Sequence, residues 1–228
     1  MIKKYKDLFS KTILAMLLYL LANMVYTYVY TLIIGHINIP GMYATPTIMI
    51  VVGNIFTALF TVPVVAYIIK QMSDYKENLI PGSFRLYLPY VLWKAIIAIL
   101  VLMPTTYFVM HKHYILSIAF PMLINLIFIK FELWLPMGIN EKLSFKDSLV
   151  SSWNRLDIGW AIAIFIVSMI PGFIQPFISS LFAKAGINGM GLFMARTAII
   201  TIFSYLILLF TITVYWNILQ REGKGKAQ

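Results

Sequence analysis

The sequence predicts an all-α fold: a polytopic membrane protein with six transmembrane helices, cytoplasmic N- and C-termini, and amphipathic helices at the inner surface. Of the 228 residues, 61% are apolar and 11% are charged, whereas about a quarter of an ordinary soluble domain is charged. Six apolar runs are close to the length of about 20 residues that a helix needs to cross the hydrocarbon layer. The chain contains no cysteine, which excludes a disulfide framework and thiol chemistry.

The first half of the chain contains three of the expected spans, within a single transmembrane domain that covers residues 1–228. The first span, at about residues 12–34, contains no charged residue. The second, at about residues 47–69, is closed by Lys70. The third is expected at about residues 93–110. Each run is bounded by charge, proline or glycine, as the ends of membrane helices commonly are.

The second half contains the other three spans. The fourth, at about residues 114–129, is joined to the third by only His111–Lys112–His113, so these two spans should form a tight helical hairpin. The fifth is expected at about residues 160–183. The sixth, at about residues 197–219, is followed by a short polar tail.

The distribution of positive charge predicts the orientation in a bacterial cell (cytoplasmic) membrane. With the N-terminus inside, 15 of the 18 Lys and Arg residues fall in inner segments, and the three outer ones are Lys112, Lys184 and Arg196. Positive loops stay in the cytoplasm, so this split favours cytoplasmic termini. Topology and attraction to anionic lipid then account for the net charge of +10. The bilayer is the expected partner, and nucleic-acid binding is not needed.

An amphipathic helix is expected from Ser144 to Leu156, between the fourth and fifth spans. Ser144 and Asp147 have the spacing of a capping box, and apolar residues recur beyond them at helical spacing. One interpretation is a helix that anchors the chain at the inner leaflet. The other is a docking surface for a cytoplasmic protein, formed by Lys146, Ser151, Trp153 and Arg155.

Neutral polar residues inside the spans have two interpretations: hydrogen bonds between helices or the lining of a polar pathway. Pro171–Gly172 in the fifth span predicts a kink or a break, and broken helices form substrate sites in many transporters. The candidate polar cavity comprises Asn23, Asn54, Asn125, Pro171, Gly172 and Gln175. Leu100 and Leu208 are expected to face lipid. The expected spans contain no acidic residue, which disfavours a carboxylate proton relay.

Enzyme activity is not expected, and neither is a cofactor or a metal site. The sequence contains no H-E-x-x-H, no G-x-S-x-G and no phosphate loop of the G-x-x-x-x-G-K-[ST] kind. His111 and His113 form an H-x-H pair at the expected outer surface. Zinc binding is one interpretation of this pair, but solvation is favoured because cysteine and outer carboxylates are absent.

Three stretches carry a resemblance to known families: Phe131–Pro136, Ile139–Glu141 and Leu143–Trp153. They resemble a segment of the YciC-like and glycerophosphodiester phosphodiesterase membrane-domain families, where a helix ending near a proline leads to an acidic residue and then to a short helix with serine and tryptophan. Met169–Gly172 resembles the I-P-G turn of those families. The resemblance implies a multi-pass bacterial membrane protein of undefined activity. The general plan is also similar to the permease of a type-2 ABC exporter.

Together these observations predict a transport-related membrane subunit. Because the sequence has no nucleotide-binding motif of its own, a permease-like component should work with a separate cytoplasmic ATPase or with another membrane subunit. The alternative is a membrane accessory or structural protein of undefined activity that transports nothing.

Overall fold

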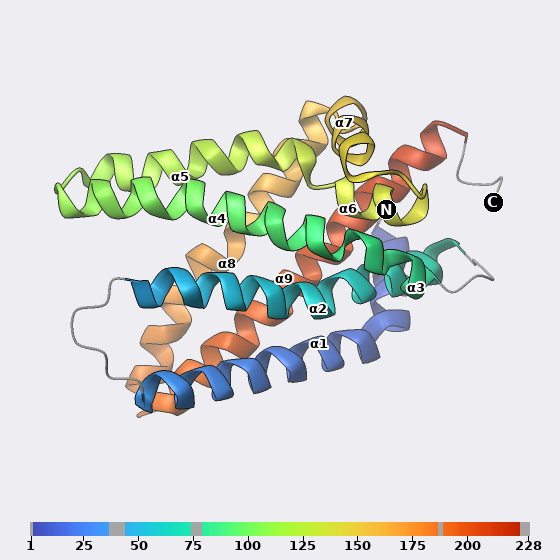
Figure 1. Ribbon diagram of the computed structural model, residues 1–228. Coiled ribbons are helices and arrows are strands. Elements are labelled where there is room, and N and C mark those ends of the chain that lie inside the picture. The colour runs from blue at the N-terminus through green and yellow to red at the C-terminus, as the bar shows by residue number, and fades with distance from the viewer. Residues whose placement is uncertain (1, 37–43, 74–78, 187–188, 224–228) are drawn as a thin grey trace.

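The computed structural model describes residues 2–36, 44–73, 79–186 and 189–223, and every regular element in these ranges is helical (Figure 1). The six long helices are α1 (Ile2–His36), α2 (Ala44–Ser73), α4 (Tyr87–Met110), α5 (Tyr114–Phe128), α8 (Ile158–Lys184) and α9 (Gly189–Arg221). The short ones are α3 (Leu79–Ser83), α6 (Trp134–Asn140), α7 (Phe145–Arg155) and the 3₁₀ helices η1 (Phe84–Leu86) and η2 (Ile129–Phe131).

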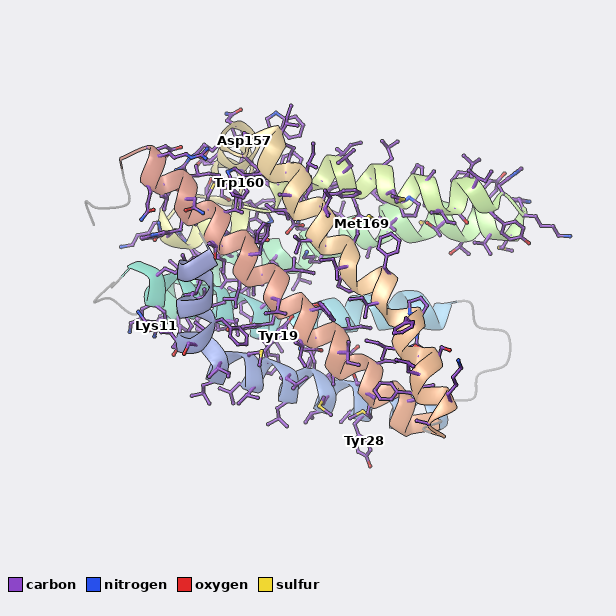
Figure 2. All side chains as sticks on the ribbon, turned by 180° about the vertical axis from the view of Figure 1, so that it is seen from behind. Lys11, Tyr19, Tyr28, Asp157, Trp160 and Met169 are labelled. Carbon is purple, nitrogen blue, oxygen red and sulfur yellow. The ribbon has the colours of Figure 1, made fainter. Side chains whose placement is uncertain are left out.

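Five stretches of the described helices are long and apolar enough to cross a membrane: Leu8–Val29, Leu79–Met110, Tyr114–Asn140, Ile158–Phe182 and Met194–Arg221. In α2 the described apolar stretch is the shorter Leu59–Met72. Large apolar side chains lie exposed along these helices, and Figure 2 shows side chains that project outward from the bundle. Ile115 is 82% and Phe173 is 74% exposed. A water-soluble protein rarely leaves such continuous apolar surface uncovered. The fold is therefore consistent with an integral membrane protein.

The short helices α3, α6 and α7 lie together at one end of the bundle of long helices (Figure 1). Helix α1 begins and helix α9 ends there, beside α3, α6 and α7, while the α4–α5 turn lies at the opposite end. Helix α9 packs against both α1 and α8, and α2 packs against α1 and α4. We call the end that carries α3, α6 and α7 the capped end.

The expected spans agree with the long helices at some boundaries and differ at others. Helix α5 begins where the fourth span was expected to begin and ends one residue before the expected end of that span. Helix α4 begins at Tyr87, six residues before the expected start, because the preceding turn is itself helical through α3 and η1. Helix α8 is continuous, and Pro171 and Pro176 both lie inside it. The Pro171–Gly172 pair therefore does not break the helix.

The expected amphipathic helix is confirmed as α7. Its N-cap is Ser144, whose side-chain oxygen accepts a hydrogen bond from the backbone N–H of Asp147 at 3.2 Å. The Ser144 hydroxyl also donates to the Asp147 carboxylate at 2.6 Å. These bonds satisfy backbone and side-chain groups that would otherwise lack partners at the first turn.

The segment between α5 and α7 contains the most completely buried helix of the capped end, α6. All seven residues of α6 are buried. A β-carbon added to Gly138 would lie 2.9 Å from the buried Leu86 side chain, so the two elements approach too closely for a larger residue. The Gly138 carbonyl accepts a hydrogen bond from Arg85 at 2.8 Å. Helix α6 thus closes the bundle at this end.

Candidate functional site

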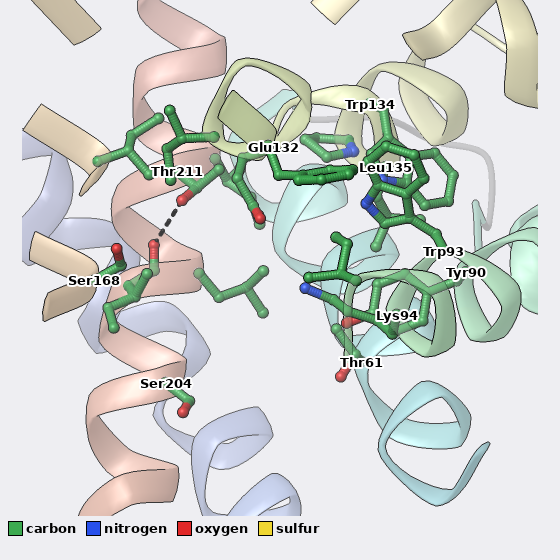
Figure 3. Close-up of a pocket in the computed structure, with 18 of the residues that line it drawn as sticks. Thr61, Tyr90, Trp93, Lys94, Glu132, Trp134, Leu135, Ser168, Ser204 and Thr211 are labelled. Carbon is green, nitrogen blue, oxygen red and sulfur yellow. Dashed lines mark hydrogen bonds between the residues drawn. The ribbon is translucent and has the colours of Figure 1, made fainter. Parts of the chain in front are cut away.

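A partly open cavity of about 370 Å³ lies between the long helices (Figure 3). Each of the six long helices contributes to its wall, and α6 contributes Trp134, Leu135 and Pro136. A cavity of this size is in the range that small-molecule sites occupy. Because α6 lies at the capped end, this buried helix separates the cavity from that end of the bundle.

Two oppositely charged side chains line the cavity: Lys94 of α4 and Glu132, which follows η2. Figure 3 shows both side chains directed into the same space. The Lys94 ammonium lies 5.6 Å from the centre of the Tyr90 ring, within the range of a cation–π interaction. Charged side chains inside a membrane protein are costly, and they commonly mark sites of function.

Hydroxyl and amide groups complete the polar part of the wall. The Tyr19 hydroxyl of α1 and the Thr61 hydroxyl of α2 share a hydrogen bond of 3.4 Å. The other hydroxyl and amide side chains of the wall are Asn125, Ser168, Ser204 and Thr211. The Tyr19–Thr61 bond joins two helices at the cavity wall. Tyr19 and Thr61 therefore do both things that were predicted for polar residues inside the spans: they join two helices, and they line the cavity.

Aromatic side chains form the wall next to Lys94. Tyr90, Trp93 and Trp134 all line the cavity, and the Tyr90 and Trp134 ring centres lie 6.2 Å apart. Trp93 packs edge-on against Phe128 at 5.3 Å. Such rings offer an apolar surface and also a negative face that attracts cations.

The structure places the residues of the predicted polar cavity in different surroundings. Asn125 lines the cavity. Asn23 donates from its side-chain nitrogen to the Tyr19 carbonyl on its own helix, at 2.8 Å. Pro171 lines a separate void of about 10 Å³. Gly172 is exposed, and an added β-carbon there would meet nothing within 4 Å. The side chains of Asn54 and Gln175 lie outside the described part of the structure.

The two residues expected to face lipid also differ. Leu100 is exposed, as the prediction requires. Leu208 instead lines the cavity, because α9 crosses the middle of the bundle and has neighbours on several sides. The expectation for Leu208 was therefore wrong.

A second polar cluster lies at the capped end and centres on Arg155 of α7. Its guanidinium forms two hydrogen bonds to Glu222, of 2.8 and 2.5 Å, and one to Glu141, of 2.5 Å. The Tyr215 hydroxyl donates to the same Glu141 oxygen at 3.0 Å and accepts from Asn140 at 2.8 Å. We call these five residues the Arg155 cluster. It ties α6 and α7 to the end of α9.

Burial and ion pairing act in opposite directions on Arg155. Burial, the largest single effect, lowers its pKa, but the hydrogen bonds and charges of Glu222 and Glu141 outweigh it and raise the pKa above the ordinary value. Arg155 therefore stays charged across the accessible pH range, and its ion pairs persist as long as the two carboxylates are ionised.

The four residues of the predicted docking surface do not share one free face of α7. Lys146 is exposed, Ser151 is half-buried, and Arg155 is engaged by the Arg155 cluster. Trp153 is 46% exposed, and its ring lies 5.4 Å from the Lys130 ammonium and 5.1 Å from the Phe131 ring. A docking role for this helix stays a prediction, and Arg155 would have to leave its ion pairs to take part in it.

No protein-family model, curated protein or solved structure matches the chain. The resemblance to the YciC-like and glycerophosphodiester phosphodiesterase membrane-domain families therefore stays a prediction. Among the residues that the structure describes, no group of three or more His, Asp or Glu side chains could hold a metal ion. The cavity is therefore the candidate functional site.

The sequence interpretation missed Lys94 and Glu132 because it assigned both charges to the inner surface. One signal could have revealed them. The predicted hairpin turns at Lys112, and Lys94 lies 18 residues before that turn while Glu132 lies 20 residues after it. Since a helix rises about 1.5 Å per residue, the two arms of the hairpin carry these residues to similar heights.

Proposed function

We propose that this chain is a transport-related membrane subunit: a permease-like component that holds a small polar solute in its central cavity and works with a separate cytoplasmic ATPase. One observation carries the proposal, namely a cavity of about 370 Å³ to which every long helix contributes and which two opposite charges line. A site built at the junction of all spans changes shape when the spans move relative to one another. Coupling of this kind is what alternating access requires.

The energy source follows from the motifs of the sequence. It contains no phosphate loop, so ATP-driven transport by this chain needs a second subunit that binds the nucleotide. The exposed surface of α7 is available to such a subunit at the capped end, through Lys146 and Trp153.

The alternative is an accessory or structural membrane protein that moves nothing. The Arg155 cluster favours it, because ion pairs between α7 and the end of α9 hold the capped end closed. In that case the cavity would be reached from one side of the membrane only, or from neither.

Access from the two sides of the membrane distinguishes these functions. The chain contains no cysteine, so a single introduced cysteine is the only site in the chain that a thiol reagent can label. We expect Ser168→Cys and Ser204→Cys, both in the cavity wall, to react with a membrane-impermeant thiol reagent from the outside in whole cells and from the inside in inverted vesicles. Reaction from both faces follows if the bundle alternates between two openings.

The matched control is Ile166→Cys, which lies on α8 two residues before Ser168 and is exposed outside the cavity. It should stay unreactive from either face, because lipid excludes the reagent. Labelling of the cavity cysteines from a single face would contradict transport and favour the accessory role. If the chain purifies from mild detergent without any ATP-hydrolysing protein, the part of the proposal that concerns the ATPase is contradicted.

A further inference from the structure

The two charges in the cavity are not paired directly with each other. Among the described residues, the side chains of Lys94 and Glu132 form no hydrogen bond, and no ion pair within 4.0 Å joins them. The charge of Glu132 is nevertheless the largest electrostatic influence on Lys94, and the Lys94 ammonium also lies 5.6 Å from the centre of the Tyr90 ring. The ammonium protons and the carboxylate lone pairs therefore stay available to a molecule in the space that both side chains face (Figure 3).

This arrangement restricts the charge of any ligand. An ion removed from water must be paired or hydrogen-bonded, or it costs several kcal/mol. A ligand with a single charge would pair with either Lys94 or Glu132, but it would place a like charge near the other and weaken the attraction between the two side chains. A ligand with one ammonium and one acidic group satisfies both at once, and the cavity with its ligand remains neutral.

The rest of the wall fits the remainder of such a molecule. Tyr90, Trp93 and Trp134 present aromatic faces, which attract an ammonium group and also cover an apolar body. Leu208 and Ile212 of α9 supply an aliphatic surface opposite them. A molecule of amino-acid size fits within about 370 Å³.

We propose that the cavity binds a zwitterion, with Glu132 accepting hydrogen bonds from the ligand's primary ammonium group and Lys94 donating to its carboxylate or phosphate. This inference rests on the proposed function, because it names the substrate class of the same site. The ligand can come from two sources with this shared chemistry: a free amino acid in water, or the headgroup of an aminophospholipid that enters from the bilayer.

The first experimental arm tests the free zwitterion. The full chain is purified into nanodiscs of phosphatidylglycerol, which has no ammonium group, and is titrated calorimetrically with phenylalanine, with 3-phenylpropanoate, which lacks the amine, and with 2-phenylethylamine, which lacks the acid. We expect phenylalanine to bind about tenfold or more tightly than either analogue, because each analogue lacks one of the two charge-assisted hydrogen bonds to the site.

Two variants give a signature that a structural role would not produce. Lys94→Met should remove the advantage of the acidic group, so that phenylalanine binds no better than 2-phenylethylamine. Glu132→Gln should remove the advantage of the amine, so that phenylalanine binds no better than 3-phenylpropanoate. The controls are Lys112→Met, in the exposed α4–α5 turn, and Asp157→Asn, at an exposed helix start. Both should keep the behaviour of the unchanged chain.

The second arm tests the lipid source. Protein from micelles that contain equal amounts of phosphatidylethanolamine and phosphatidylglycerol is examined by native mass spectrometry. Preferential retention of phosphatidylethanolamine, lost in both Lys94→Met and Glu132→Gln, supports the zwitterion site with a lipid ligand.

The inference is overturned if either one-charge analogue binds as tightly as phenylalanine, or if neither arm shows a zwitterion bound. Its failure can be told apart from failure of the proposed function. Cavity cysteines that react from both membrane faces without zwitterion binding leave transport standing with another substrate class. If the cavity cysteines stay unreactive from either face, both the transport proposal and the zwitterion proposal are contradicted.

Discussion

Trp134→Ala should lower the free energy of unfolding by about 3–5 kcal/mol, the largest effect that we expect from a single truncation in this chain. Trp134 is 2% exposed and lies in α6, where its ring contacts Phe145 at 5.0 Å and Tyr90 at 6.2 Å. Removing the indole leaves a void between α4, α6 and α7 and also deletes two aromatic contacts. Unfolding in mixed micelles with increasing SDS, followed by circular dichroism, measures the change.

The matched control is Trp153→Ala on α7, because the same atoms are removed from a position that is 46% exposed. Its cost should be less than half that of Trp134→Ala, since fewer contacts are lost. Equal costs for the two variants would contradict the assignment of α6 as the buried helix of the capped end.

Arg155→Ala should lower the free energy of unfolding by about 2–4 kcal/mol, because it leaves the Glu141 carboxylate without its cationic partner in a mostly buried position, with only the hydrogen bond from Tyr215 remaining. The Arg155 and Glu141 side chains are 13% and 20% exposed, so solvent screening reduces the cost below that of a fully buried pair. The same SDS titration measures it.

Arg221→Ala provides the control for Arg155→Ala. Arg221 approaches Asp157 at 3.9 Å, but the two side chains are 69% and 55% exposed, and surface pairs of this kind contribute about 0–1 kcal/mol. The double variant Arg155→Ala/Glu141→Gln should be more stable than the sum of the two single losses predicts, because the stranded charge is removed. Additive losses would show that the Arg155 cluster does not act as one unit.

Elements of this fold that depend on residues close together in the sequence were predicted, whereas those that depend on packing between distant segments were not. The start of α7 follows from Ser144 and Asp147, three residues apart, and α5 lies between charges at Lys112 and Lys130. These are local signals, and both elements lie where they were expected. Helix α6 has only seven residues, too few for a recognisable apolar period, and its burial depends on packing against α2, α3, α7 and α9.

The cavity shows the same limit. Asn125 was predicted to line it, and the other neutral polar residues of the spans were left open between helix contact and the lining of a polar pathway. Composition treats Lys94 and Glu132 as boundary charges, because each lies at the end of an apolar run. The two side chains reach the same cavity because the α4–α5 hairpin folds the chain back on itself. The Arg155 cluster likewise joins residues that are up to 82 positions apart, Asn140 and Glu222, which no local pattern reveals.

The most direct test of the central claim, that the bundle encloses a water-filled charged cavity, is the reactivity of Ser168→Cys relative to Ile166→Cys in nanodiscs. The two positions lie at similar depth on α8, but only Ser168 lines the cavity. We predict that a small water-soluble thiol reagent modifies Ser168→Cys about tenfold or more faster than Ile166→Cys, since only the thiolate reacts and it forms only where water reaches the sulfur. Equal and slow modification of both cysteines would show a dry core and contradict the account.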